Sequence, residues 1–318
     1  MFVYEGNFSE CPRLCVSLLR HLLFLFCTGT LNRTYSDADN CLVAGRTMDY
    51  GPFGFVDVYH PLSAKWTGSG EHFGFMNQPN AGFANFAVLV ESLLPIIDAN
   101  GGDGEATREE MLEKAKGVFS DAVGKAMRMK MGFEGGPAEV VKEADELWEG
   151  IEPLLRGSRG DWVLFWRQLT YVAAEYKNES SDYKGMLKTL LGDKQTYPFY
   201  DKLSGEDEAS LLAWIEKWHQ LLCKCYSDDG SSAPEEIMRL ANPKYVLREY
   251  MLVDAYLKAD SGKTPGSPLP VTSDYSGVHE LYSLIKEPYS EGTEEQSKKY
   301  YRRAPDESLT AGGTAFMS

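Results

Sequence analysis

The feature that most restricts the fold is the spacing of apolar residues from residue 105 onward. Successive segments place them three or four positions apart, which is typical of helices with one buried face. Breaks rich in Gly, Ser and Pro separate these segments, most clearly at 135–137 and 260–274. The chain has 318 residues, 43% of them hydrophobic and 25% charged, which is ordinary globular composition and enough for a sizeable core. The sequence therefore predicts a mostly α-helical body.

Helix caps and periodicity divide this body into segments. The helices predicted from the sequence cover 83–97, 107–130, a stretch ending near 155, one beginning at 161, 206–226, one beginning near 234, 245–259 and 278–286. We expect the first to be a buried helix, and a capping box at Thr107 and Glu110 to open the second. Asp161 is the expected N-cap of its helix, and the stripe of Trp162, Phe165 and Trp166 behind it is expected to be core.

The charge balance restricts the partners. Lys and Arg number 32 and Asp and Glu number 47, so the formal net charge is −15. A chain this acidic is poorly suited to wrapping a nucleic-acid backbone or an anionic membrane. We therefore expect no nucleic acid and no membrane as partners, although a local basic cleft for a nucleotide is still allowed.

Residues 1–30 differ from the rest of the chain, and we treat them as an atypical N-terminal segment before a unit covering 31–318. Cys15 to Cys27 reads CVSLLRHLLFLFC, which Arg20 and His21 interrupt. The run is shorter than the roughly 20 residues that a membrane span needs. Three interpretations stay open: a signal-like segment, a short buried helix, and sequence that is not native.

Other potential ligands give weaker signals. Cys223 and Cys225 form a pair with no second pair at zinc spacing, so we expect two ordinary thiols. We expect His219, in an aromatic-rich helix, to be structural. A charged run near the end is expected to be a solvated helix with opposite charges three or four positions apart. Its members are Glu291, Glu294, Glu295, Lys298, Lys299, Arg302 and Arg303.

The densest cluster of groups suited to catalysis is Asp37, Asp39, Asn40 and Asp49, which precedes a Gly-rich loop. Carboxylate and amide oxygens can hold Mg²⁺, which completes its shell with water and phosphate oxygens. A further carboxylate can accept a proton from an attacking hydroxyl. Asp and Asn also populate loops for turn reasons, so the spacing leaves both interpretations open.

Longer sequence motifs help to decide between the catalytic and the turn-forming interpretations. Residues 49–55 read DYGPFGF, 161–167 read DWVLFWR and 242–248 read NPKYVLR. Shorter matches are Asn77-Gln78-Pro79, Gly82 with Asn85, Lys130 to Phe133, and Tyr301, Arg303 and Pro305. In their order along the chain, these motifs resemble those of the selenoprotein O family, also called the YdiU family. The resemblance covers about residues 31–318.

The resemblance implies a fold and an activity. Family members are kinase-like proteins that transfer AMP from ATP to Ser, Thr or Tyr hydroxyls of proteins, so it implies a protein-kinase-like C-lobe. By match to the family pattern, Asp39 is the proton acceptor, and Asn40 and Asp49 hold Mg²⁺ or Mn²⁺. Asp49 also lies against the ATP phosphates. Mitochondrial localisation is implied by eukaryotic members.

The resemblance also implies that this sequence is the C-terminal half of the family pattern. Family members carry an N-terminal lobe with a nucleotide-clamping Lys, and they end with a Cys or selenocysteine before a short tail. We expect a selenocysteine codon after Ser318. The alternative to a partial enzyme is a non-catalytic helical interaction protein of the same family. A secreted or membrane-anchored helical domain is the third hypothesis.

Overall fold

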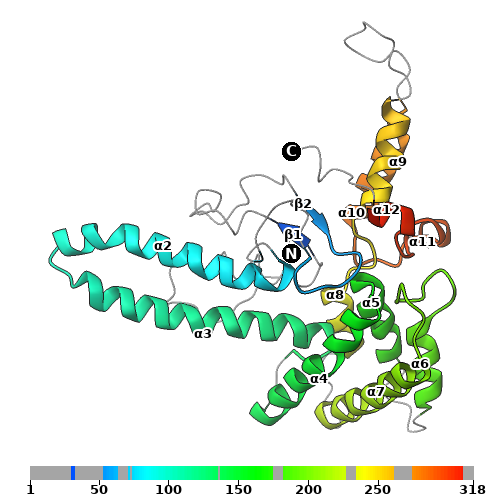
Figure 1. The fold of residues 1–318 in the computed structure, drawn as a ribbon, viewed down its shortest axis with the longest axis horizontal. Helices are drawn as coiled ribbons and strands as arrows, with labels where there is room; N and C mark the ends of the chain where they lie inside the picture. Colours follow the sequence, from blue (N-terminus) through cyan, green and yellow to red (C-terminus); the bar gives the residue numbers. More distant parts are fainter. Residues whose placement is uncertain are drawn as a thin grey trace, which may run out of the picture.

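The computed structural model describes residues 30–32, 53–63, 71, 74–134, 137–174, 182–226, 234–260 and 274–310. Most of the regular structure in these ranges is helical, as predicted (Figure 1). The helices are α2 (Gln78–Ala99), α3 (Gly104–Lys130), α4 (Ala138–Gly157), α5 (Trp162–Ala173), α6 (Tyr183–Leu191), α7 (Gly205–Cys225), α8 (Pro234–Ala241), α9 (Glu249–Asp260), α10 (Ser276–Lys286), α11 (Glu294–Tyr300) and α12 (Asp306–Thr310). A 3-10 turn, η4 (Phe75–Asn77), precedes α2. Strands β1 (Thr30–Asn32) and β2 (Phe53–Phe55) pair antiparallel.

Helix α5 lies at the centre of the body, and nearly all of its side chains are buried. Asp161 caps it, accepting hydrogen bonds from the backbone N–H groups of Val163 and Leu164, as the sequence predicts. Trp162 and Trp166 on one side join the main hydrophobic core, where Trp162 stacks on the ring of Tyr59 with centroids 5.0 Å apart. The aromatic stripe is therefore core, as predicted.

Leu164 projects into a second, smaller core that α5 shares with α9 and α10. The other side chains in this core come from α9, from α10, from the segment before α9 and from the end of α11. They are Tyr245, Met251, Ala255, Leu281, Leu284, Tyr300 and Tyr301. Because α5 contributes to both cores, it joins the two halves of the helical body.

Helices α4, α6 and α7 pack beside α5 in the lower part of Figure 1. A capping box of Ser204 and Asp207 opens α7. Its Trp218 fills the core and donates its indole N–H to the carbonyl of Met131 at 2.8 Å. Trp214 donates in the same way to Leu147 on α4. Each indole thus buries a large apolar ring while its N–H finds an acceptor.

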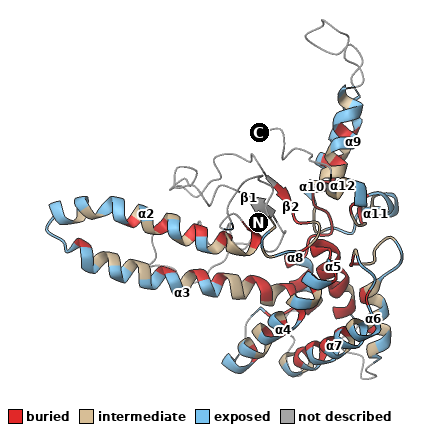
Figure 2. Cartoon of the chain, in the orientation of Figure 1, coloured by how far each residue is buried: buried red, intermediate tan, exposed pale blue. Residues whose placement is uncertain are grey.

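Helices α2 and α3 form an antiparallel hairpin that extends from the body (Figure 1). Residues 83–97 are helical, as predicted, but the helix is not buried along its whole length, so that part of the prediction was wrong. Only the half near the body is covered, and Val88 and Ile96 are 54% and 59% exposed (Figure 2). Phe75–Ala99 is long and apolar enough to cross a membrane by length and composition. Core helices pass the same test, so the predicted absence of a membrane partner stays a prediction.

Three predicted helix starts were wrong. Helix α2 begins at Gln78 rather than at residue 83. Helix α3 begins at Gly104 because Asp103, not Thr107, caps it by accepting from the backbone N–H of Ala106. Helix α9 begins at Glu249 rather than at Tyr245. The backbone N–H of Tyr245 instead donates to the carbonyl of Pro288, which holds this segment outside the helix.

Candidate active site

The predicted catalytic and metal-binding residues Asp39, Asn40 and Asp49 lie outside the described residues. The two strands that border their segment are described, however. Asn32 at the end of β1 pairs with Phe53 at the start of β2. The segment 33–52 therefore starts and ends at the same place on the molecule.

A buried ion pair cluster anchors the chain just after β2. The guanidinium of Arg248 contacts Asp57 at 2.6 Å and Asp161 with two nitrogens, each at 2.8 Å. The side chains of Arg248, Asp161 and Asp57 are 3%, 0% and 10% exposed. We call these three residues the Arg248 cluster. They come from three distant parts of the sequence, so the cluster ties the downstream end of the predicted catalytic segment to α5 and to the segment before α9.

Backbone hydrogen bonds reinforce this attachment. The stretch after β2 lies antiparallel to the start of α5, with Val58 bridged to Asp161. Two bonds join these segments: Trp162 N–H to Asp57 O at 3.2 Å and Tyr59 N–H to Gly160 O at 2.7 Å. The position of residues 57–59 is thus fixed by side-chain and backbone contacts together.

The charges in the Arg248 cluster sum to −1, and its surroundings offset this excess. The partial positive charge at the N-terminus of α5 lies next to Asp161. Burial alone would lower the pKa of Arg248, but the carboxylates of Asp161 and Asp57 hold it well above its usual value. Tyr200 donates its hydroxyl to Asp161 at 3.3 Å, and burial together with that carboxylate raises its pKa. The phenol therefore stays neutral and remains a donor.

Asn242 is the centre of a second buried network, between α3 and α5. Its side chain accepts from the ammonium of Lys130 at 3.0 Å and donates to the carbonyl of the same residue at 2.9 Å. It also donates to the hydroxyl of Thr170 at 3.2 Å, and its carbonyl accepts from Arg167 at 2.9 Å. All four residues are buried. Asn242 thus links α3, α5 and the segment after α8 by hydrogen bonds, although these segments are far apart in the sequence.

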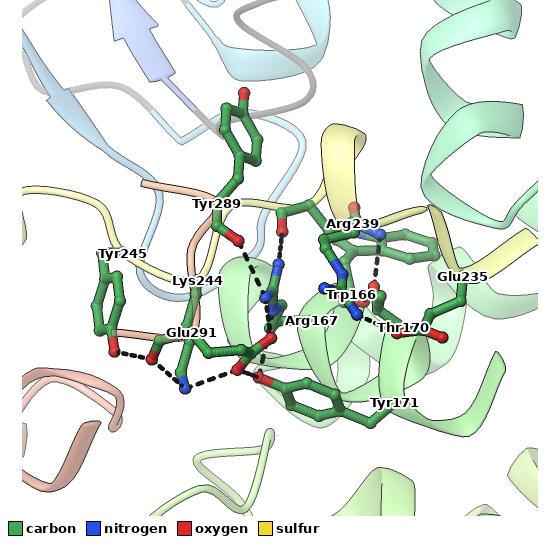
Figure 3. Close-up of polar contacts among 11 residues, drawn as sticks. Trp166, Arg167, Thr170, Tyr171, Glu235, Arg239, Lys244, Tyr245, Tyr289 and Glu291 are labelled. Carbon is green, nitrogen blue, oxygen red and sulfur yellow. Dashed lines mark hydrogen bonds and ion pairs between the residues drawn. The ribbon is translucent and has the colours of Figure 1, made fainter. Parts of the chain in front are cut away.

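Glu291 is the centre of a third network (Figure 3). Its carboxylate accepts from Arg167, from Lys244 at 2.9 Å and from the hydroxyl of Tyr171 at 2.8 Å. Its backbone carbonyl accepts from Lys244 at 2.9 Å and from Tyr245 at 2.7 Å. Burial opposes ionisation of this carboxylate. The hydrogen bond from Lys244 and the charge of Arg167 outweigh it and lower the pKa of Glu291 to about 2.

The prediction that Glu291 belongs to a solvated helix was wrong. Helix α11 begins at Glu294, three residues later, where Thr293 and Gln296 form a capping box. The prediction is correct for Glu294, Glu295, Lys298 and Lys299, which lie on α11, and Glu294 and Lys298 form an exposed pair at 2.7 Å, one turn apart. It is wrong for Arg302 and Arg303, which follow the end of that helix. Glu291 precedes the helix, and its carboxylate forms ion pairs with Arg167 and Lys244 on other segments.

Replacing Glu291 with glutamine should remove a pH-dependent part of the stability. The pKa of Glu291 is lowered from 4.5 to about 2 on folding. Its contribution is therefore complete above pH 4.5 and is lost as the pH falls toward 2. Urea unfolding of both proteins between neutral pH and pH about 3 should show Glu291→Gln less stable at neutral pH, with the gap narrowing in acid. Glu294→Gln is the control. A gap that does not change with pH would contradict this assignment.

Where the structure describes residues of the family-like motifs, most of them form hydrogen bonds or ion pairs with other parts of the chain. Asn77 donates to the carbonyl of Glu71 at 2.7 Å, and Arg303 donates to the carbonyl of Phe199. The roles of Asp57 and Arg248 are not evident from spacing. One sequence feature could have indicated these roles: Asp57 and Arg248 each follow directly after a short apolar stretch. A charged side chain that is buried with such a stretch needs an opposite charge nearby.

Potential metal ligands do not gather within the described ranges. No group of three or more His, Cys, Asp or Glu side chains there could hold an ion. Within the described residues Cys223 and Cys225 form no disulfide, and burial raises the pKa of both thiols. His219 is buried edge-on to Tyr183, in line with a structural role.

Comparison of the sequence with known proteins places this chain in a family. The family model described as "Protein adenylyltransferase SelO" matches residues 23–267. Proteins named "Protein nucleotidyltransferase YdiU" are 27% identical in Xanthomonas campestris pv. campestris strain B100, over 97% of this chain and 52% of the relative. In Aliivibrio fischeri the relative of that name is 30% identical over 84% of this chain and 45% of its own length. The chain spans about half the length of the curated relatives it matches.

Proposed function

The chain belongs to the protein adenylyltransferase SelO family, and from this we propose that it is the catalytic half of an enzyme that transfers AMP from ATP to protein hydroxyl groups. The observation that carries the proposal is the extent of the family match, residues 23–267, which includes Asp39, Asn40 and Asp49. The relatives' name supports nucleotidyl transfer in general. AMP as the transferred group, proteins as acceptors and a kinase-like C-lobe at 31–318 are parts of the proposal.

The proposed reaction breaks the bond between the α-phosphorus and the bridging oxygen of the pyrophosphate. A hydroxyl of the protein substrate attacks that phosphorus, its proton passes to the carboxylate of Asp39, and pyrophosphate leaves. The amide oxygen of Asn40 and the carboxylate of Asp49 form a donor set that suits Mg²⁺. When bound, the ion would stabilise charge on the phosphate oxygens.

The described residues support the positioning that such a reaction requires. Catalytic groups are effective only when they are held close to the productive geometry. The pairing of Asn32 with Phe53 joins the two ends of the segment 33–52. The Arg248 cluster then attaches residue 57 to the helical body. Holding both ends of this segment would help to keep the base Asp39 and the two ligands Asn40 and Asp49 near the productive geometry.

Magnesium-dependent ATP binding tests the proposal. The 318-residue chain is expected to bind ATP with Mg²⁺, and Asp49→Ala should weaken binding at least about tenfold, or ~1.4 kcal/mol. Asp39→Asn should keep ATP binding and lose the adenylyl adduct on protein substrates, read by intact mass. The exposed Asp121→Asn on α3 is the matched control and should change neither. If neither the chain nor Asp49→Ala binds ATP, the non-catalytic interaction protein is the better interpretation.

A further inference from the structure

A groove of about 460 Å³ lies along α6. Its lining residues, within 184–197, include no member of the Arg248 cluster or of the predicted catalytic segment 33–52. Its walls combine apolar and cationic side chains. They include Lys184, Leu187, Lys188, Leu191, Lys194 and Tyr197. The groove is shallow and wide open to solvent, so it suits a segment lying on the surface rather than an enclosed small molecule.

The local sequence explains how these side chains come to share one face. Asp182 caps α6 by accepting from the backbone N–H of Gly185 at 3.0 Å. Met186 and Leu190 are buried against the core, Leu187 and Leu191 next to them are half-buried, and Lys184 and Lys188 are exposed. Gly192, at φ 62°, ends the helix and redirects the chain so that the next turn completes the groove.

The groove is cationic in a chain whose net charge is −15. In the described part of the chain, Lys184, Lys188 and Lys194 form no ion pair, whereas many other lysines there pair with a Glu. The one acid on the groove wall is Asp193. Its carboxylate is occupied by the backbone N–H of Gln195 at 2.8 Å and by Thr196, and these hydrogen bonds lower its pKa. The carboxylate stays ionised, so the three lysines and Asp193 give the groove wall a formal charge of 3 − 1 = +2.

The apolar lining indicates what else the ligand must carry. Leu187, Leu191 and Tyr197 are half-buried, so their outer surfaces line the groove without being covered. The guanidinium of Arg303 lies over the ring of Tyr197, with 5.8 Å from its carbon to the ring centroid, and adds positive charge at this end. A ligand that neutralises the lysines and also covers these side chains needs anionic and apolar groups in alternation.

We propose that this groove binds an acidic peptide segment of a partner protein, in which Glu or Asp side chains flank Leu- or Phe-type side chains. Lys184 and Lys188 lie one helical turn apart, about 6 Å. Acidic side chains two apart on an extended strand are separated by about 6.6–6.8 Å, close to that spacing. Because the groove is built from residues 184–197, the inference does not rest on nucleotide transfer.

Fluorescence anisotropy with the 318-residue chain tests the inference. The probe is a labelled peptide that alternates Glu with Leu and Phe. The triple variant Lys184→Gln, Lys188→Gln, Lys194→Gln should lose at least about tenfold in affinity, and added salt should weaken binding by the unchanged chain. The control triple Lys116→Gln, Lys142→Gln, Lys286→Gln removes the same charge from other exposed positions and should bind as the unchanged chain does. Leu187→Ser should also weaken binding, which separates apolar docking from charge attraction.

Several results would overturn the proposal. These are no peptide binding by the unchanged chain, equal loss in both triples, or unchanged binding after Leu187→Ser. Tight binding of anionic phospholipid vesicles with no binding of the peptide would point to a lipid surface instead. Thermal unfolding followed by circular dichroism confirms that each variant is folded, and ATP binding measured beside it separates this site from the proposed catalytic one.

Discussion

Replacing Arg248 with methionine should lower the free energy of unfolding by about 3–5 kcal/mol. The change leaves Asp57 and Asp161 as buried carboxylates whose main counter-charge is gone. It also breaks the link that attaches residue 57 to the helical body. Denaturant unfolding of the variant and the unchanged chain gives the difference directly.

A matched control makes this result specific. Arg239→Met breaks a helical pair with Glu235, one turn apart, whose side chains are 46% and 30% exposed. Such a pair is worth about 0.3–0.5 kcal/mol, so the control should lose less than about 1 kcal/mol. Equal losses in the two variants would show that the Arg248 cluster contributes no more than a surface pair.

Replacing Asn242 with alanine should have a comparable effect, about 3–5 kcal/mol, because several buried groups lose a partner at once. The ammonium of Lys130 loses the acceptor at 3.0 Å, and the backbone carbonyl of Lys130 loses a donor. The hydroxyl of Thr170 loses a donor as well. Urea unfolding again measures the change.

The control for this prediction is an amide at an exposed helix end. The side chain of Asn100 donates to the carbonyl of Ile96 at 2.7 Å in an exposed position. Water can replace that bond, so Asn100→Ala should lose less than about 1 kcal/mol. A loss at Asn242 no larger than at Asn100 would mean that the buried network relaxes around the cavity.

The sequence predicted the helical body well because most helices bury one stripe. Helix α7 begins within one residue of its predicted start, and Asp161 caps α5. The prediction missed α6, a nine-residue helix that ends in a left-handed Gly192. A helix this short carries too few apolar positions for its period to stand out. The prediction also placed residues 83–97 in the core, because an apolar stretch alone does not say what covers it.

The candidate site could be predicted only in part. The family resemblance is confirmed, while the assignments to Asp39, Asn40 and Asp49 stay predictions. Nothing in the local sequence says that Asp57 meets Arg248, because that contact depends on the folded path of the chain. Glu291 was misplaced for the same reason: its partners come from other segments, and nearby lysines and arginines suggested a local pairing.

The distance along the chain between Asp57 and Arg248, 191 positions, affects the order in which the molecule is assembled. Contacts between remote residues form late because they must overcome the entropy of closing a long loop, whereas helices form locally and early. During synthesis the strand pair emerges long before the arginine that holds it. The attachment of residue 57 to the helical body is therefore among the last contacts to form, and an unfinished polypeptide that ends before Arg248 lacks it.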